Sequence, residues 1–240
     1  MTLRNIPGII SGHRYIKVYV VISFTRLFCS RMDPLLPLFP LKVVAFPGED
    51  LNLHIFEPRY KELMDDILKG DSLFGLPAFV NDKIEFGTLM KVTEVFKTYE
   101  DGRRDIRTRG LRVFRVLDYL NPADGKLYAA GHVEYLENRI KQDPLQHGYM
   151  TEKLNEYYSY IQVKGSKEIN ENVVSFDVAH HLGLSIEEEY ALLKMEQESE
   201  RQEYIIAHLD RILPALKMAA RASEIIKMNG HFKNFDPIDF

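Results

Sequence analysis

The hydrophobic pattern of this chain changes its period once, close to residue 138, and this change most constrains the fold. Between residues 35 and 137, short apolar runs alternate with polar residues and end at turn-forming dipeptides, which is typical of β-strands. Beyond residue 138, apolar residues recur every three or four positions, which is typical of amphipathic helices. The sequence therefore predicts an α+β fold, with a β-rich half at 32–137 and a helical half at 138–240.

Strand patterns in the β-rich half surround one helical pattern. A helix is predicted to begin at Pro58 and to end before Gly70, because proline suits a first helical turn and glycine a helix end. Asp101-Gly102 marks a hairpin turn, and Gly110 marks a bulge between two strands. Together the runs predict a strongly curved antiparallel sheet or open barrel with one inserted helix. The predicted strands are 41–46, 51–55, 73–80, 88–99, 103–108, 111–120 and 127–136.

Capping signals divide the helical half. Asp143-Pro144 begins a helix that is predicted to reach Gly165, and Ser175 is predicted to cap a short helix. Ser185 and Glu188 have the spacing of a capping box. A long helix is predicted to follow this box and to run, with a kink or restart at Pro214, to Asn229-Gly230.

Charge separates an N-terminal extension from the rest. Residues 1–31 contain five basic and no acidic side chains, whereas residues 32–137 carry a net charge of −4 and residues 138–240 a net charge of −5. The acidic body disfavours broad binding to a phosphate backbone. The extension is predicted to lie outside the fold, with translation starting at Met32. A transit-peptide role remains an alternative.

Composition excludes several other classes of protein. The chain has 240 residues, 45% of them hydrophobic, and a single cysteine, Cys29. Such a chain is typical of a soluble globular protein rather than a disordered one. One cysteine forms no internal disulfide and no cysteine-based zinc site, so a reducing compartment is expected.

Motifs for catalysis and metal binding are sparse. The chain contains no phosphate-binding G-x-x-x-x-G-K-[ST] loop, no G-x-S-x-G and no H-E-x-x-H. Ser166-Lys167 is interpreted as a solvated turn. His180-His181 is expected to divide between a packed and a solvated side chain, because adjacent helical residues point about 100° apart. Glu187–Glu189 is interpreted as a solvated first helical turn. No catalytic residue, metal or cofactor is predicted.

Arginine is concentrated between residues 103 and 115. Acidic residues are interspersed, and strand alternation distributes the arginines over both faces of a sheet. Local ion pairs are therefore favoured over a patch that binds a ligand or partner, and no basic-aromatic stripe is visible along the chain. The arginines are Arg103, Arg104, Arg107, Arg109, Arg112 and Arg115.

Several of these segments, taken together and in order, resemble the LON substrate-binding domain, the N-terminal domain of ATP-dependent Lon proteases. The resemblance covers roughly residues 34–215, including SFDVAHHLGLSIEEEYALLK at 175–194 in the helical half. In the β-rich half it is carried by LPLFPLKVVAFPGEDLNLHIFEPRY at 36–60, FGTLMKVTEV at 86–95, RGLRVFRVLDY at 109–119 and AAGHVEYL at 129–136.

The resemblance implies a PUA-like β-subdomain followed by a helical subdomain. Residues at family positions are interpreted as maintaining the fold more than contacting a ligand. They are Phe46, Pro47, Gly48, Phe56, Glu57, Pro58, Arg59, Tyr60, Arg109, Gly110, Arg112 and Phe114. Residues that bind a partner are not identified by the pattern.

The resemblance further implies a non-catalytic module that binds unfolded or apolar polypeptide, or a protein partner such as a protease or chaperone. ATPase and Ser-Lys peptidase motifs are absent from the 240 residues, so no enzymatic activity is expected. The alternative is a nucleic-acid-binding protein, since PUA-like folds elsewhere bind RNA, although nucleic acid is not the expected partner. We expect a cytoplasmic, bacterial protein without a stable membrane anchor, and self-association stays open.

Overall fold

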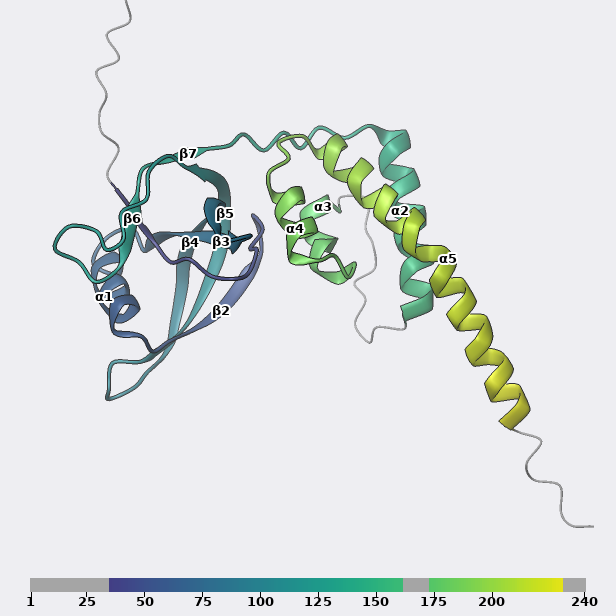
Figure 1. Cartoon of the computed structure of the whole chain (residues 1–240), viewed down its shortest axis with the longest axis horizontal. Helices are drawn as coiled ribbons and strands as arrows, with labels where there is room; N and C mark the ends of the chain where they lie inside the picture. The colour runs from purple at the N-terminus through teal and green to yellow at the C-terminus, as the bar shows by residue number, and fades with distance from the viewer. Residues whose placement is uncertain (1–34, 162–172, 231–240) are drawn as a thin grey trace, which may run out of the picture. The chain divides into compact units, whose positions relative to one another are not determined.

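The computed structural model describes residues 35–161 and 173–230 (Figure 1), with side chains up to residue 226. The 1–31 extension and Ser166-Lys167 lie outside the described residues. The β-rich half consists of strands with one inserted helix, as predicted, although several strand bounds differ. Its elements are β1 (Leu36–Leu38), β2 (Asp50–Ile55), α1 (Pro58–Ile67), β3 (Leu73–Val80), β4 (Lys83–Thr98), β5 (Arg104–Val116), β6 (Ala129–Gly131) and β7 (Val133–Tyr135).

The strands form one mixed sheet in the order β2-β5-β4-β3-β1-β6, with β7 also paired to β5. An antiparallel sheet throughout was expected, but β1 pairs parallel to β3. The end strands β2 and β6 do not pair with each other, so the main path of the sheet is not closed. One residue beyond β6, β7 pairs with β5. The strong curvature predicted from the strand pattern is not observed, and the PUA-like form stays a prediction from the family resemblance.

The helix α1 confirms the prediction made from its apolar spacing. Pro58 occupies its first turn, and the helix ends at Ile67, shortly before Gly70. Its buried face packs on the sheet with residues of β2 to β5, including Phe74, Met90 and Ile106. Side chains three and four positions apart share one face of a helix, which is why the spacing of the apolar residues predicted this helix. The buried residues of α1 are Tyr60, Leu63, Met64 and Ile67.

The apolar run 41–46 is not a strand, contrary to the prediction. Its one ladder contact is an isolated bridge between Leu41 and Ala78. Val44 and Phe46 enter one hydrophobic cluster, whereas Ala45 enters another. Burial on both sides makes the run apolar, and this burial does not require a partner strand.

The strand β5 is continuous where two strands were predicted. Gly110 lies within it, and the register against β4 shifts there, because Leu89 faces Arg112 while Met90 faces Gly110. This shift is the β-bulge expected at Gly110. The run 127–136, predicted as one strand, divides into β6 on β1 and β7 on β5.

The helical half contains α2 (Pro144–Ile161), α3 (Ser175–Val178), the short 3-10 helix η1 (Ala179–His181), α4 (Ile186–Leu193) and α5 (Glu198–Gly230). The Asp143 carboxylate accepts a hydrogen bond from the Leu145 N–H at 2.9 Å, as expected for a cap. The Ser185–Glu188 capping box is present with both of its hydrogen bonds. Pro214 lies inside α5, which continues through it.

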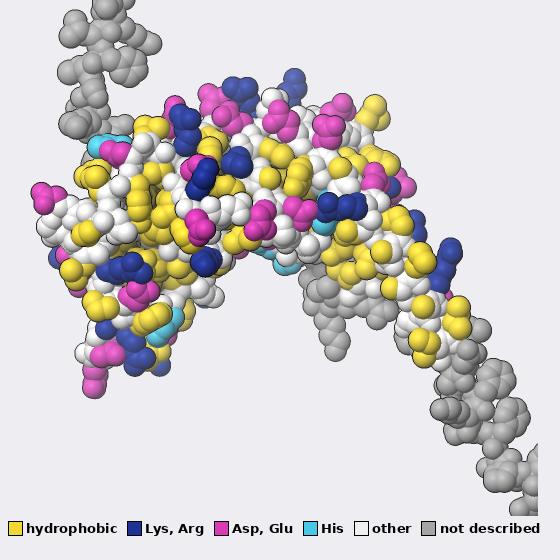
Figure 2. Space-filling model, viewed as in Figure 1, with side chains coloured by type: hydrophobic (Ala, Val, Ile, Leu, Met, Phe, Trp, Pro, Cys, Tyr) yellow, Lys and Arg dark blue, Asp and Glu magenta, His cyan; other side chains and the backbone are white. Residues whose placement is uncertain are grey.

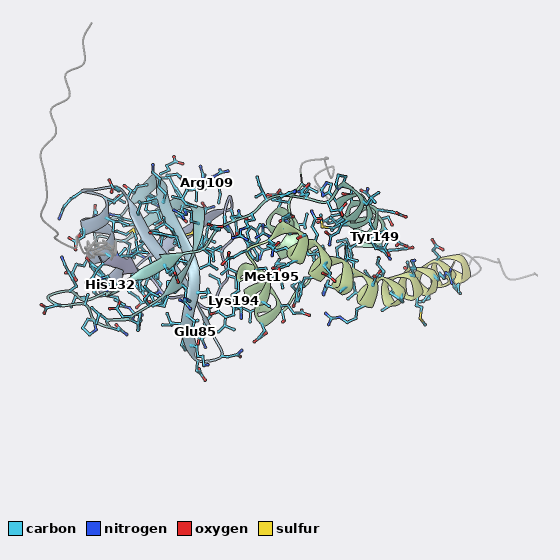
Figure 3. The ribbon with its side chains drawn as sticks, turned by 90° about the horizontal axis from the view of Figure 1, so that it is seen from above. Glu85, Arg109, His132, Tyr149, Lys194 and Met195 are labelled. Atoms are coloured by element: carbon cyan, nitrogen blue, oxygen red, sulfur yellow. The ribbon has the colours of Figure 1, made fainter. Side chains whose placement is uncertain are left out.

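Two predictions for the helical half are wrong. Ser175 lies inside α3, where Val174 precedes the helix, and its N–H and hydroxyl both donate to the Glu198 carboxylate at 2.8 Å. The predicted long helix is broken between α4 and α5, where Lys194 and Met195 lie (Figure 3). The linker residue Arg139 pairs with this break, donating from its N–H to the Glu196 carbonyl and accepting from the Glu198 N–H, both at 2.9 Å. These hydrogen bonds to Arg139 take the place of the backbone hydrogen bonds that a further helical turn would make at the break.

A substitution at Gly110 tests the close contact between β5 and the backbone of Phe46. A Cβ atom at position 110 would overlap the carbonyl oxygen of Phe46, and neither backbone has room to move within a packed core. We expect Gly110→Ala to lower the free energy of unfolding by at least about 2 kcal/mol.

The matched control for Gly110→Ala is Gly148→Ala in α2, where a new Cβ meets nothing within 4 Å. This change should leave stability unaltered or raise it by up to about 1 kcal/mol, because alanine favours helices. Denaturant unfolding of the three proteins gives the comparison. Equal stabilities for the two variants would contradict the assigned contact.

Candidate functional site

The Phe46–Glu49 turn lies where the β-rich half meets the helical half. Gly48 has a positive φ of 89°, a conformation that glycine adopts without steric cost. The Gly48 N–H donates to the Gly110 carbonyl, and the Gly110 N–H donates to the Glu49 carbonyl, both at 2.8 Å. The absent side chain of Gly110 therefore lets the turn bond directly to the bulge in β5.

The helical half packs on this turn. The ring of Phe46 is fully buried and stacks on Phe176 of α3 at 5.0 Å, with the His180 ring 4.8 Å away. His180 joins two carboxylates, lying 3.0 Å from Glu49 and 2.7 Å from Glu189 of α4. The expected division of the histidine pair is observed only in part, because both residues are exposed and His180 differs by its contacts with the Phe46 ring and two carboxylates.

The two carboxylates change the titration of His180. Its hydrogen bond to Glu49, opposed by burial and reinforced by Glu189, raises the pKa of His180 to about 9. Burial acts to raise the pKa of Glu49, but hydrogen bonds from His180 and from the Phe46 N–H outweigh it, so that this pKa is lowered. His180 is consequently a cation at neutral pH, held between two anions.

A second contact joins the halves on the other side of α4. The Tyr190 hydroxyl accepts a hydrogen bond from the Phe86 N–H at 3.2 Å, and the two rings meet edge to face at 6.2 Å. Lys194 lies over the Tyr190 ring at 4.7 Å. With Phe46, this contact connects the sheet and the helices in one hydrophobic cluster.

The signature residues around α1 divide into buried and exposed members. Tyr60 is buried against Phe39, with ring centroids 3.8 Å apart. Glu57 and Arg59 bond to each other at 2.8 Å. Phe56, by contrast, has an exposed fraction of 58%, although it belongs to the same short motif as Tyr60.

The arginines of β5 and its hairpin contact carboxylates, as the interspersed charges predicted, but the partners come mainly from neighbouring elements. Arg109 pairs with Asp50 of β2, Arg107 with Glu94 of β4 and Arg115 with Glu134 of β7. Three others have different surroundings. Arg103 pairs with the adjacent Asp101, Arg104 is largely buried and pairs with Asp65 of α1, and Arg112 lies over the Tyr135 ring at 4.7 Å. Phe114, between these arginines, is fully buried.

Exposed aromatic rings gather at the end of the sheet formed by β2, β4 and β5. Phe56 stacks on His54 at 6.0 Å, and His54 meets Tyr99 edge to face at 5.9 Å. Phe96 has an exposed fraction of 49%. We name His54, Phe56, Phe96 and Tyr99 the ring surface. The sequence shows no basic-aromatic stripe along the chain. The pairing of three strands brings these rings together, which a pattern of neighbouring residues does not reveal.

Asp105 of β5 holds two members of the ring surface, His54 and Tyr99, and two cations lie over the Tyr99 ring. Its carboxylate contacts His54 at 2.5 Å and accepts a hydrogen bond from the Tyr99 hydroxyl at 2.8 Å. Lys97 and Arg103 lie over the Tyr99 ring at 4.3 and 4.8 Å. Rings fixed in this way lose little conformational freedom on binding, which favours an interaction surface.

Within residues 35–161 and 173–230, no group of three or more histidine, cysteine or acidic side chains is arranged to hold a metal ion. Over the same part of the chain, no helix is both long and apolar enough to cross a membrane.

The substrate-binding domain of the ATP-dependent protease La (LON) matches residues 35–211. The chain therefore belongs to the LON substrate-binding domain family, as its motifs implied.

Individual relatives agree with this assignment. A crystal structure of a Lon N-terminal domain protein from Xanthomonas campestris is 26% identical, with a TM-score of 0.56, and covers 73% of this chain and 98% of that one. The N-terminal domain of a Mycobacterium avium complex Lon protease has a TM-score of 0.55 and the same coverage, and at 13% identity it shows the fold alone. Protein cereblon of Danio rerio is 29% identical over 119 residues, which are 46% of this chain and 27% of cereblon. The chain thus spans about a quarter of that relative.

The charge on His180 predicts a dependence of stability on pH. Because the folded pKa of about 9 exceeds the ordinary value of 6.5, the contribution is fully present below pH 6.5 and is lost as pH rises through 9. Because His180 is an exposed residue, solvent screening reduces this contribution, and at pH 6 we expect His180→Gln to lower the free energy of unfolding by on the order of 1 kcal/mol.

The difference between wild type and His180→Gln should shrink steadily between pH 6.5 and about 9. The control is the exposed neighbour, His181→Gln, which should match wild type at every pH. Denaturant unfolding across this range measures both variants. A difference for His180→Gln that is constant with pH would contradict the ionised contact.

Proposed function

We propose that this protein is a non-catalytic binding module that captures unfolded, apolar polypeptide segments through the ring surface. The exposed rings of Phe56, which stacks on His54, and of Phe96, which has Arg107 over it, are the observation that carries the proposal. Large apolar side chains that lie together on the surface, exposed to water, often mark interaction surfaces. Membership of a substrate-binding domain family supports the same reading.

The chemistry of the ring surface suits extended polypeptide. Aromatic rings bury large apolar areas and tolerate varied side chains, because most of their binding energy is not directional. Lys97 has no ion pair with a described residue, and Arg103 lies over Tyr99, so backbone carbonyls and acidic side chains of a bound segment would find donors at the rim. Affinity should be modest, since an unfolded segment loses chain entropy when it is ordered.

Nucleic acid is the weaker candidate. The arginines at 103, 104, 107, 109 and 115 each face a carboxylate, so a phosphate would have to displace an existing pair. The acidic body would also repel a polyanion. We propose that bound segments pass to a partner of the protease or chaperone class in protein quality control, with no chemistry performed by the LON domain itself.

Fluorescence anisotropy with the full chain tests the ring surface, using a labelled, permanently unfolded polypeptide at about 150 mM salt. We expect weak binding by wild type. The double change Phe56→Ser with Phe96→Ser should raise Kd by about tenfold or more, because each removed ring takes away roughly 1 kcal/mol or more of contact energy.

The matched control is Leu145→Ser, which removes an apolar side chain that is 86% exposed on α2 and should leave Kd within about twofold of wild type, below 0.5 kcal/mol. Thermal melts confirm that the changes at exposed positions leave the fold intact. Equal affinities for wild type and the double variant would contradict the ring surface. Tight binding of labelled RNA without any polypeptide signal would favour the nucleic-acid alternative.

A further inference from the structure

The end strand of the sheet, β2, has one backbone edge without a partner strand among the described residues (Figure 1). It pairs with β5 alone, at six successive positions without a shift in register. Natural sheets protect such an edge with lysine, proline, a bulge or a covering segment. The sequence of β2, DLNLHI, contains neither lysine nor proline, and its regular register shows no bulge. The chemistry of this strand therefore does not prevent the addition of another.

The hydrogen-bonding pattern of β2 identifies the backbone groups on its free edge. The carbonyls of Glu49 and Leu51 accept hydrogen bonds from residues of β5, so both point toward β5. Successive residues of an antiparallel strand point their N–H and C=O groups to opposite edges. The backbone groups of Asp50, Asn52 and His54 consequently point away from β5, and no described residue forms a backbone hydrogen bond with them.

The side chains of β2 form two rows along this edge. Leu51 and Leu53 pack against the hydrophobic cluster that contains the buried face of α1, and they are only partly buried. Apolar residues of an added strand would cover the exposed parts of both leucines. Asp50, Asn52 and His54 are exposed on the opposite face, because side chains alternate along a strand.

The exposed row of β2 leads into the ring surface. His54 belongs to both, and it stacks on Phe56, the next residue on that face. At the other end, Asp50 pairs with Arg109, and 53% of each side chain is exposed. Figure 2 shows hydrophobic, histidine and charged side chains together at the end of the β-rich half where the β4–β5 hairpin lies. Cross-strand pairing therefore favours an aromatic residue opposite His54 and a basic residue opposite Asp50.

We propose that the free edge of β2 binds polypeptide by strand addition, as an extra antiparallel strand along Asp50–Ile55. This inference rests on the polypeptide binding proposed above and specifies its form, in which backbone hydrogen bonds hold the segment and the ring surface receives an aromatic side chain. The antiparallel direction is chosen because antiparallel ladders are slightly more stable per residue. The ligand is an extended segment of about six residues, apolar at alternate positions, with an aromatic residue four positions before a basic one.

Selective N-methylation of a synthetic peptide tests strand addition to the full chain. The probe is fluorescein-labelled Val-Phe-Val-Thr-Val-Lys, flanked by Gly-Ser at both ends, which places its phenylalanine opposite His54 and its lysine opposite Asp50. Methylation of the threonine nitrogen removes an N–H that faces β2. Methylation of the valine that follows the threonine is the matched control, because it removes an N–H that faces solvent and restricts the backbone similarly.

We expect methylation at the threonine to raise Kd by about tenfold or more, and methylation at the valine to leave Kd within about threefold of the parent peptide. Equal Kd values for the two methylated peptides would overturn strand addition, as would no binding of the parent peptide where an unfolded polypeptide binds. A larger loss for the valine would overturn the antiparallel direction. If Phe56→Ser with Phe96→Ser still weakens polypeptide binding in these cases, the ring surface is retained, so the two proposals fail separately.

A change in β2 provides the converse test. Asn52→Pro removes an N–H on the free edge, a position where strands tolerate proline, and its control Asn52→Ser keeps this N–H. We expect Asn52→Pro to raise Kd of the parent peptide by about tenfold or more, and Asn52→Ser to match wild type. Thermal melts verify the fold, and the two methylated peptides decide the question if proline destabilises β2. Wild-type dimers that Asn52→Pro abolishes, without peptide binding, would overturn the proposal in favour of a second copy.

Discussion

The close approach of the Phe46 carbonyl to the backbone of Gly110 is the constraint on which the rest of the structure depends. Because position 110 lacks a side chain, the Phe46–Glu49 turn bonds to β5 through two 2.8 Å backbone hydrogen bonds. This turn also places the buried Phe46 ring against Phe176 and the Glu49 carboxylate beside His180. One missing Cβ therefore positions the whole contact between sheet and helices.

Polar groups specify how the helical half is arranged around this contact. Glu198 and Arg201 are almost wholly buried and bond to each other at 2.9 Å, while Ser175 adds two donors to the Glu198 carboxylate. Arg201 also lies over the Phe176 ring at 4.3 Å. Buried ion pairs add little net stability but tolerate few alternative arrangements. This network ties the start of α5 to α3, and through Phe176 to Phe46.

The family signature and the proposed binding surface are largely different sets of residues. Phe46, Gly110 and Phe114 are buried, and the arginines nearby are occupied by ion pairs. Phe56 is the exception, since it belongs to the signature and is 58% exposed. A motif that identifies the domain therefore records mainly how it folds. The proposed binding surface combines His54 and Phe56 of the 36–60 segment with Phe96 and Tyr99, which lie outside the segments that carry the resemblance.

Sequence patterns were sufficient wherever the relevant contacts are local or periodic. The inserted helix α1, the strand β3, the bulge at Gly110 and the Ser185 capping box were all predicted, because spacing and capping chemistry act over a few residues. The run at 41–46, the break between α4 and α5 and the role of Ser175 were not. In each of these, a partner far along the chain supplies the bonds: Gly110 for the turn after residue 46, Arg139 for the break, and Glu198 for Ser175. The ring surface was missed for the same reason, since His54, Tyr99 and Asp105 meet only through the pairing of strands. The sequence by itself determined the family and the order of the elements, whereas tertiary structure decided where apolar runs and polar groups find their partners, because those bonds join residues that are distant along the chain.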